Sequence, residues 1–352
     1  MARQRRRGAQ QVTIREVAAE ANVSVMTVSR VINGEKNVSA KNLAAVQAAI
    51  KHLDYIPNPT ARRLAGSVHC RIGMLYNNPS LSFLSEFMLG ALSECSASGH
   101  QLLVERCGMT VAAEQAAVQK LLQCRIDSIV LPAPLSEAKA VLSAVKKAGI
   151  AMVAVAVGEP GVDVATIRID NYKAAHQLAQ HLINLGHRRI GFIKGHPNQT
   201  VSNQRLRGFL DSLAQNDLET LPELVEQGYF SYHSGLLASE RLLALPIRPT
   251  AIFASNDDMA AAAVATANRL GLRVPHDLSV VGFDDTLIAS TIWPGLTTIH
   301  QPVEAMGRAA IKVVLEEMKR LRNGETGGPA QRKLRYTLVE RESTAPPPKL
   351  SY

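Results

Sequence analysis

The sequence is poor in cysteine, has no long apolar run and lacks any segment of the secretory-signal type. Its four cysteines are scattered over 352 residues and include no CxxC pair. Free thiols in a reducing compartment are therefore expected, rather than a disulfide framework or a zinc site. No apolar run reaches the length of about 18 residues that suggests a membrane span. These absences predict a cytoplasmic protein without a membrane-spanning helix.

The short motifs of several enzyme classes are also missing. The chain contains no GxSxG, no P-loop, no GxGxxG after a strand and no HExxH. The aspartate pairs at 257/258 and 284/285 could in principle bind a metal, but no histidine or cysteine accompanies them at ligand spacing. His187, just before a strand, is interpreted as structural. We expect no catalytic residue, no metal and no cofactor.

The positive charge of the chain is concentrated near its N-terminus. Residues 1–67 contain 11 lysines and arginines and 4 acidic residues, a net charge of +7, whereas the whole chain carries +9. A small segment that holds most of the positive charge is typical of a domain that binds a polyanion. Arg3 and residues 5–7 form a basic arm, for which a solvated tail is the alternative interpretation. The composition, 46% hydrophobic and 20% charged, is that of an ordinary globular protein.

Residues 12–64 have the pattern of a helix-turn-helix DNA-binding domain. Thr13 is a good N-cap, with Glu16 three residues later, and it starts a first helix. Ser24 follows a break in the pattern and can cap a second helix, and Ser39 opens a third. The positions expected to face inward are Val17, Ala18, Ala21, Val28, Val31, Ile32, Leu43, Val46, Ile50 and Leu53.

The outward positions of the second helix suit base and phosphate contacts. Arginine pairs with guanine edges, threonine and serine contact bases or phosphates, and valine or methionine touches thymine methyls. Any small three-helix domain with a polar face is the alternative, and the local charge favours DNA binding. The expected contacts in this region are Thr13, Val25, Met26, Thr27, Ser29, Arg30 and Asn33.

This segment resembles the DNA-binding headpiece of the LacI (lactose repressor) family of bacterial transcription regulators. The motifs that carry the resemblance are TIREVAAEANVSVMTVSRVIN, VSAKNLAAVQAAIKHLDYIPN and ARRLAG. It implies a headpiece over residues 1–57 and a hinge helix in residues 58–67, with DNA contacts by Asn58, Ala61 and Leu64. It also implies that Leu64 is wedged into the minor groove, although without the resemblance it reads as a linker leucine.

From residue 71 onward, short apolar strands alternate with helices. Two series of such units predict an α/β fold with two similar lobes, each built on a parallel sheet covered on both faces. The first series comprises RIGMLYN, HQLLVERC, SIVLPA, AMVAVAV and ATIRID, and the second comprises RIGFIKG, LVEQGYF, TAIFASND and LSVVGFDD. A long amphipathic helix, VEAMGRAAIKVVLEEMKRLRNG, and a last strand within RKLRYTLVERES follow. The proline-rich tail, residues 346–352, is not expected to be ordered.

These features resemble the periplasmic-binding-protein-like core of the same family. The carrying motifs are IDNYKAAHQLAQHLINLGHRRIGFI, RLRGF, AIFASNDDMAAAAV, LSVVGFDD and LTTIHQP. The resemblance implies three crossings between the lobes. The long helix then returns to the first lobe and the last strand to the second. The first lobe is expected to comprise residues 68–167 with 301–331, and the second residues 168–300 with 332–345.

Ligands of open α/β sheets bind beyond the carboxyl ends of the strands, where this chain has several polar side chains and an aromatic ring. Such a set suits a polyhydroxylated ligand. Each residue has a plainer interpretation: a helix cap for Asn256, a turn for Asp284, a surface charge for Arg205 and a core position for Phe230. The family pattern favours ligand contacts, and the loop of residues 195–199 is expected to shape the cleft. The candidate effector contacts are Asn77, Phe83, Arg205, Phe230, Asn256 and Asp284.

The sequence therefore predicts a repressor that binds a palindromic operator as a homodimer and responds to a sugar in its cleft. A tail without a leucine heptad argues against a tetramer. The family also includes a nucleobase-binding member, so a purine-like effector stays open. The competing class is a sugar-processing or sugar-transporting protein with this core, against which the headpiece argues.

Overall fold

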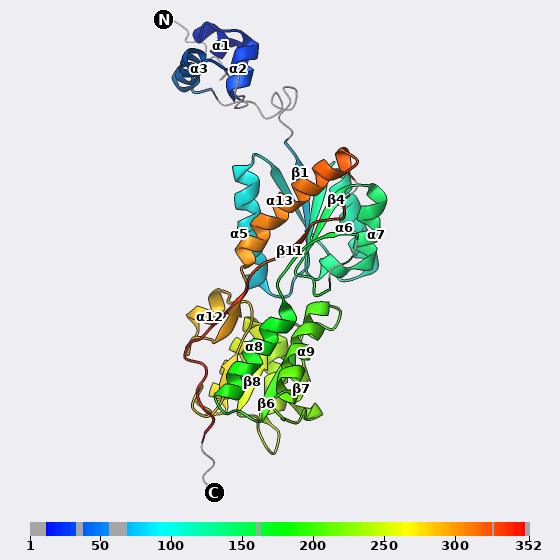
Figure 1. Cartoon of the computed structure of the whole chain (residues 1–352), viewed down its shortest axis with the longest axis vertical. Helices are drawn as coiled ribbons and strands as arrows, with labels where there is room; N and C mark the ends of the chain where they lie inside the picture. Colours follow the sequence, from blue (N-terminus) through cyan, green and yellow to red (C-terminus); the bar gives the residue numbers. More distant parts are fainter. Residues whose placement is uncertain are drawn as a thin grey trace, which may run out of the picture. The chain divides into compact units, whose positions relative to one another are not determined.

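The computed structural model describes residues 12–32, 38–55, 69–159, 161, 163–325 and 327–348. The chain divides into two compact units, Met1–His69 and Cys70–Tyr352 (Figure 1). Several predicted features fall outside the described residues: the basic arm, the hinge helix, and the DNA contacts Asn33, Asn58, Ala61 and Leu64.

The first unit contains the three predicted helices, α1 (Ile14–Glu20), α2 (Val25–Ile32) and α3 (Ala40–His52). Thr13 and Glu16 form the predicted capping box: the Thr13 N–H donates to Glu16 Oε2 at 2.7 Å, and the Glu16 N–H donates to Thr13 Oγ1 at 3.4 Å. Ser24 accepts a hydrogen bond from the Thr27 N–H at 3.1 Å, and Ser39 caps α3. Local side-chain caps thus define where each helix begins.

The buried core of this unit consists of Val17, Ala18, Val28, Val46, Ala49 and Tyr55. The predicted burial of Leu43 is wrong, since this side chain is 39% exposed. Leu43 lies in the first turn of α3, and α1 and α2 leave it uncovered. The centre of α3, at Val46 and Ala49, makes the contact with the other two helices instead.

The first lobe of the core is a six-stranded parallel sheet in the order β11-β5-β4-β3-β1-β2. The strands are β1 (Arg71–Tyr76), β2 (Gln101–Arg106), β3 (Ser128–Pro132), β4 (Ala151–Val155), β5 (Ala165–Arg168) and β11 (Gln331–Lys333). One face is covered by α5 (Leu81–Ala97) and α13 (Val303–Arg322), and the other by α6 (Val111–Gln123) and α7 (Lys139–Ala148). A short 3-10 helix, η1 (Leu135–Glu137), follows β3.

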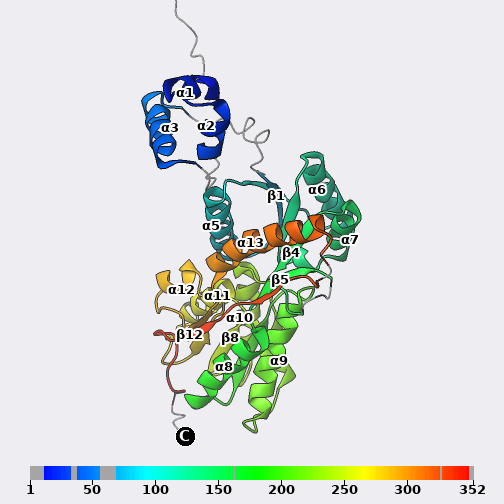
Figure 2. The same cartoon turned by 45° about the horizontal axis from the view of Figure 1, so that its top comes forward.

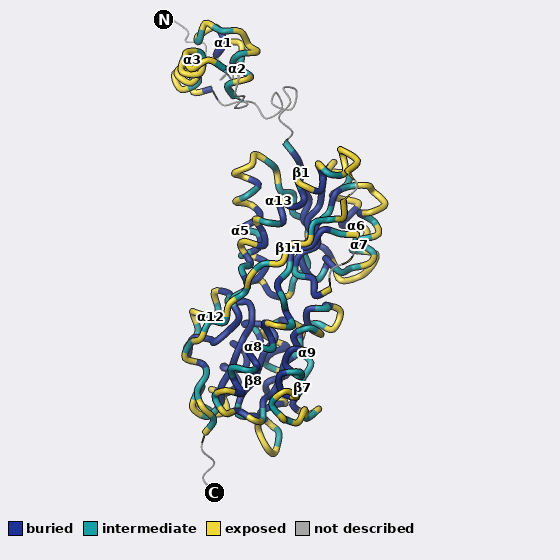
Figure 3. The backbone as a smooth tube through the Cα atoms, in the orientation of Figure 1, coloured by how far each residue is buried: buried dark blue, intermediate teal, exposed yellow. Residues whose placement is uncertain are grey.

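The second lobe repeats this plan on a parallel sheet in the order β7-β6-β8-β9. Its strands are β6 (Ile190–Lys194), β7 (Val225–Gln227), β8 (Ala251–Ala254) and β9 (Ser279–Val281). One face packs on α8 (Asn171–Asn184) and α9 (Thr200–Ala214), and the other on α10 (Tyr232–Leu243) and α11 (Asp257–Arg269). Short helices η2 (Pro222–Leu224) and α12 (Leu287–Thr291) complete the lobe. Figure 3 shows buried segments at the centre of each lobe and exposed ones on its outside.

The chain crosses between the lobes three times, as predicted. The crossings join β5 to α8, β10 (Thr298–His300) to α13, and β11 to β12 (Thr337–Val339). Figure 2 shows the C-terminal segment, in red, passing from the first lobe to the second. None of the described helices has the length and apolar character that a membrane span requires.

The last strand differs from the prediction because it is two short strands on different sheets. Arg332 and Lys333 pair with β5 in the first lobe, whereas β12 pairs antiparallel with β10 in the second. Leu334 lies at the crossing and packs against the cores of both lobes. The boundary therefore lies near residue 334 rather than at 332, at the point where the partly buried Leu334 contacts both cores. Of the proline-rich tail, residues 346–348 are described and have no regular secondary structure.

Candidate functional site

The outer face of α2 carries exposed apolar side chains together with polar ones. Val25 is 42% exposed and Met26 is 64% exposed, although valine and methionine are usually buried. Arg30 is exposed on the same helix, and Thr27 and Ser29 are half-buried. A helix face with this mixture of methyl groups, hydroxyls and a guanidinium suits contact with base edges. Five of the predicted DNA contacts therefore lie together on one short helix.

Thr13 has a structural role in addition to the predicted one. Its hydroxyl donates to Glu16 Oε2 at 2.9 Å, as part of the capping box of α1. The residue is exposed, so its contact with DNA stays a prediction.

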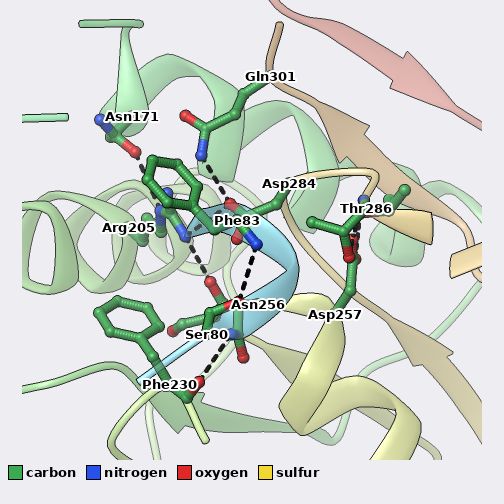
Figure 4. A network of polar contacts seen from close by, with 12 residues as sticks. Ser80, Phe83, Asn171, Arg205, Phe230, Asn256, Asp257, Asp284, Thr286 and Gln301 are labelled. Carbon is green, nitrogen blue, oxygen red and sulfur yellow. Dashed lines mark hydrogen bonds and ion pairs between the residues drawn. The ribbon is translucent and has the colours of Figure 1, made fainter. Parts of the chain in front are cut away.

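The core contains a cavity between its lobes, at the carboxyl ends of the strands. Its volume is about 400 Å³, including the part open to solvent. Five of the six predicted effector contacts line it: Phe83, Arg205, Phe230, Asn256 and Asp284. Phe83 comes from α5 in the first lobe and the other four from the second, so both lobes contribute to the same site (Figure 4).

Asn77 is the predicted contact that does not line this cavity. Its Nδ2 donates to the Gly108 carbonyl at 3.3 Å, whereas the neighbouring Asn78 lies in the cavity wall. Asn78 donates to the Ala133 carbonyl at 2.9 Å and accepts from the Ser80 N–H at 2.8 Å. Successive side chains of an extended segment point in opposite directions. The prediction was therefore wrong by one residue, and Asn78 rather than Asn77 faces the cavity.

Arg205 is a buried anchor of the cavity and not a surface charge, since only 4% of it is exposed. Its Nε donates to Asn171 Oδ1 at 3.0 Å, and its Nη1 donates to the Ser255 carbonyl at 2.5 Å. The guanidinium carbon lies 3.6 Å from the centre of the Phe283 ring. These contacts hold the guanidinium in one orientation.

Asp284 faces Arg205 and is equally buried. Its Oδ1 accepts a hydrogen bond from Gln301 Nε2 at 2.8 Å and lies 3.5 Å from Arg205 Nη1. Burial removes water from the carboxylate and raises its pKa to about 7, although the Arg205 charge acts in the opposite direction. Asp284 is therefore a carboxyl group poised to change protonation state near neutral pH.

Asn256 performs the helix-capping role that was its plainer interpretation. Its Oδ1 accepts from the Met259 N–H at 3.1 Å, and its Nδ2 donates to the Phe230 carbonyl at 3.0 Å. The Phe230 ring packs directly over Gly195, where a Cβ would overlap the ring. Asn256 and Gly195 thus position an aromatic ring in the cavity wall.

Sequence reasoning missed several polar side chains of the cavity. Asn171 and Gln301 lie at crossings between the lobes, where each follows the end of a strand; this position was the signal that could have found them. Gln199 lies in the loop that was predicted to shape the cleft but was assigned no contact; it is 4% exposed, and among the described residues its Nε2 has no hydrogen-bond partner. The other missed polar residues are Asn78 and Ser80.

Asp257 and Asp285, one from each aspartate pair, bind different protein groups. Asp257 accepts from the Thr286 N–H at 2.8 Å and from Thr298 Oγ1 at 2.7 Å, and burial raises its pKa well above the usual value. Asp285 contacts Arg341 Nη2 at 2.6 Å and His300 Nδ1 at 3.0 Å. Over the described parts of the chain, no group of three acidic, histidine or cysteine side chains is arranged to hold a metal ion.

Comparison with known proteins accounts for both units. Residues 13–58 match the family described as bacterial regulatory proteins, lacI family, and residues 179–344 match the periplasmic binding protein-like domain. The HTH-type transcriptional repressor PurR of Pectobacterium carotovorum subsp. carotovorum (strain PC1) is 34% identical over 341 residues, which cover 97% of this chain and 99% of that protein. The chain belongs to the LacI family. It is a DNA-binding transcriptional repressor of that family.

Two solved structures of transcriptional regulators are similar to this chain over nearly its whole length. The lac repressor dimer bound to operator and the anti-inducer ONPF matches with a TM-score of 0.76 and 30% identity, covering 96% of this chain and 100% of that one. The complex of the transcriptional regulator CelR with cellobiose matches with a TM-score of 0.71 and 31% identity, covering 95% and 100%.

Proposed function

We propose that this LacI-family repressor binds a palindromic operator as a homodimer and that a sugar or sugar derivative in the core cavity controls its binding. The observation that carries the effector assignment is the buried set of Arg205, Asp284 and Gln301, which line the cavity together with Phe83 and Phe230. Because the protein is proposed to bind an operator in the bacterial chromosome, we expect it in the cytoplasm.

The polar groups of the cavity complement a polyhydroxylated ring. Sugar hydroxyls both donate and accept hydrogen bonds; Asp284 offers an acceptor, Arg205 and Gln199 offer donors, and Asn171 offers an amide. A phenylalanine ring packs on the apolar C–H face of a sugar. The similar CelR structure contains cellobiose, which is a sugar ligand in a protein of the same fold.

A nucleobase is the second candidate, and one observation favours it. Phe83 and Phe230 reach the cavity from opposite lobes, so a flat aromatic ring could lie between them. A sugar accounts for more of the lining. Eight of the residues that line the cavity are polar, and a base has fewer hydrogen-bonding groups than a sugar.

For DNA binding, we propose that α2 enters the major groove and that the hinge supplies the minor-groove contacts. Val25, Met26, Arg30 and their neighbours on α2 form the reading surface. The net charge of +7 on residues 1–67 supplies affinity that does not depend on sequence. The remaining proposed contacts are Thr13, Asn33, Asn58, Ala61 and Leu64.

The dimer is proposed to form through α5, which leaves an apolar stripe uncovered. Leu81 is 75% exposed, Leu89 is 60% exposed and Leu92 is 45% exposed, and their spacing places them on one side of the helix. A two-fold operator requires a two-fold protein, and the similar lac repressor structure is a dimer on its operator. We therefore assign the stripe to a second copy of this chain.

Two measurements test these proposals. A mobility-shift assay on palindromic sites selected from random DNA should give a specific complex; the absence of any specific site would contradict the operator assignment. Thermal-shift screening of sugars and nucleobases should show stabilisation by a sugar, because a ligand that binds only the folded state raises the unfolding midpoint. Stabilisation by nucleobases alone would replace the sugar by the second candidate.

A further inference from the structure

Helix α9 begins without a cap from its own sequence. Its N-cap residue, Gln199, makes no side-chain capping bond. The missing acceptor comes from the first lobe instead: the Thr200 N–H donates to Glu137 Oε2 at 2.8 Å, and the Thr200 hydroxyl donates to Glu137 Oε1. Glu137 lies in η1, 63 residues earlier in the chain. A carboxylate of one lobe therefore caps a long helix of the other.

The backbone of Gly158, in the first lobe, also contacts the second lobe beside Glu137. The Gly158 N–H, after β4, donates to Thr200 Oγ1 at 3.0 Å and to Glu137 Oε1 at 3.2 Å. The Gly158 carbonyl accepts from Gln204 Nε2 at 2.7 Å. A Cβ on Gly158 would lie 2.6 Å from the Thr200 carbonyl carbon and 2.7 Å from the Val201 nitrogen. Only glycine permits this approach, so closure of the lobes depends on it.

The same helix carries three residues of the effector cavity. Gln199 precedes its first turn, Val201 lies within that turn, and Arg205 lies one turn further. The Gln199 side chain lines the cavity, and its buried Nε2 has no partner among the described residues. A buried amide donor without a partner is unfavourable unless something fills the position. The start of α9 is thus where lobe contact and ligand recognition meet.

We propose that Glu137 is a positioning residue for effector binding: by capping α9 across the cleft, it closes the first lobe onto the second and holds Gln199 Nε2 against an acceptor oxygen of the effector. The proposal rests on the effector function of the cavity. Its physical basis is that the unpaired N–H groups of a helix N-terminus attract a carboxylate. In an open cleft, water binds both the Glu137 carboxylate and the N–H group at the start of α9. Closure replaces these two contacts with water by one charge-assisted hydrogen bond between the lobes.

The size of the effect follows from the charge on Glu137. Hydrogen bonds to charged groups are worth more than neutral ones, so loss of the charge should reduce effector affinity by roughly tenfold. Glu137→Gln retains the shape and one acceptor oxygen but removes the charge. Gly158→Ala replaces no residue of the cavity lining and separates the lobes sterically. Gly161→Ala, in the same loop with no atom within 4 Å of the added Cβ, is the matched control.

Closure is measured directly in the full-length protein without ligand. Cys124 is exposed and the other three cysteines are buried, so a spin label on Cys124 and a second on an introduced cysteine at exposed Asn268 report the distance between the lobes. Glu137→Gln and Gly158→Ala should shift the distance distribution to longer values, while Gly161→Ala should leave it unchanged. Unchanged distributions in both test variants would overturn the proposal.

A second experiment measures effector binding by calorimetric titration of the same variants with cellobiose and glucose. Glu137→Gln should weaken binding roughly tenfold, and Gln199→Ala should weaken it with no change in the distance distribution of the free protein. Gln199→Ala with full affinity would overturn the role of its amide. If no sugar binds the native protein, the sugar assignment fails, and the distance measurement still decides whether Glu137 closes the lobes.

Discussion

Arg205 of α9 and Asp284 after β9 face each other inside the cavity, with Nη1 and Oδ1 3.5 Å apart and both side chains almost fully buried. The guanidinium also donates to Asn171 and Ser255, and Gln301 donates to Asp284. Oδ2 of Asp284 receives no hydrogen bond from the described residues. An effector hydroxyl can therefore bind this oxygen without breaking an existing contact.

Effector affinity should depend on pH around neutrality. Because burial raises the pKa of Asp284 to about 7, the carboxyl group gains its charge as pH rises through that value. A hydroxyl donates more strongly to the ionised form, so affinity for the effector should increase between about pH 6 and pH 8. Titration of effector binding over this range checks the prediction, and Asp284→Asn should weaken binding and flatten the pH profile.

The same group should affect folding stability with the opposite trend. A carboxyl whose folded-state pKa is raised contributes stability below its unfolded value, and that contribution is lost as pH rises through about 7. The free energy of unfolding of the effector-free protein should therefore fall less steeply with pH in Asp284→Asn. The carboxyls with a raised pKa, Asp257, Asp258 and Glu86, and the histidines with a lowered pKa, His181, His187 and His196, remain in that variant, so only the difference in slope between the two proteins belongs to Asp284. An identical slope in both proteins would contradict the assignment.

Gly195→Ala should reduce effector affinity by displacing the Phe230 ring. The added Cβ overlaps that ring, and overpacking of this kind costs about 1–3 kcal/mol of folding stability unless the ring moves out of the cavity wall. Isothermal titration against the effector measures the loss. Gly328→Ala, where nothing lies within 4 Å of the added Cβ, is the control and should bind normally.

Arg30→Ala should relax sequence discrimination by the repressor. If Arg30 forms a bidentate pair with guanine, its loss should reduce discrimination at that base pair by about 1–3 kcal/mol. Arg15, exposed on α1, is the matched control. Arg15→Ala should weaken binding to all operator sequences equally and reduce the salt slope of the binding constant by about 1. Mobility shifts over a set of single-base operator variants separate the two patterns. Equal weakening of every operator by Arg30→Ala would show that it contacts phosphate.

Thr13→Ala should weaken operator binding, because it destabilises α1 and also removes a proposed DNA contact. Loss of an N-cap destabilises a helix by about 1 kcal/mol, and here the capping box with Glu16 is lost as well. The Thr110 side chain caps α6 in the core, without a capping box, so Thr110→Ala is the control. Operator affinity should fall in Thr13→Ala and stay unchanged in Thr110→Ala. A fall in both variants would mean that the effect is not local to the headpiece.

Leu89→Asp should dissociate the dimer. A charge placed in the apolar stripe of α5 would be buried without a partner against the second copy. Ile247, which is 69% exposed in the second lobe, gives the control Ile247→Asp, which should sediment like the native protein. A native protein that sediments as a monomer, or a Leu89→Asp variant that remains dimeric, would require a different interface.

Local features of the fold could be read from the sequence because they depend on neighbouring residues. The caps at Thr13, Ser24 and Ser39 each act within three residues, and the predicted helices begin where these caps place them. The alternation of short apolar strands with helices similarly predicted the parallel sheets of both lobes. The division of the last strand at Leu334 escaped prediction, since it depends on two cores that only the folded chain brings to one residue.

The sequence by itself determined the class of this protein: the capped helices, the charged headpiece and the two-lobed core all follow from short-range patterns and their resemblance to the LacI family. The tertiary structure alone decided which polar groups are available to a ligand. In the structure Asn78, and not Asn77, lines the cavity, and Asn256 Oδ1 caps a helix. The buried Nε2 of Gln199 has no hydrogen-bond partner among the described residues. The physical reason is that these side chains belong to different elements of two lobes, and hydrogen bonds formed on folding decide which atoms remain free.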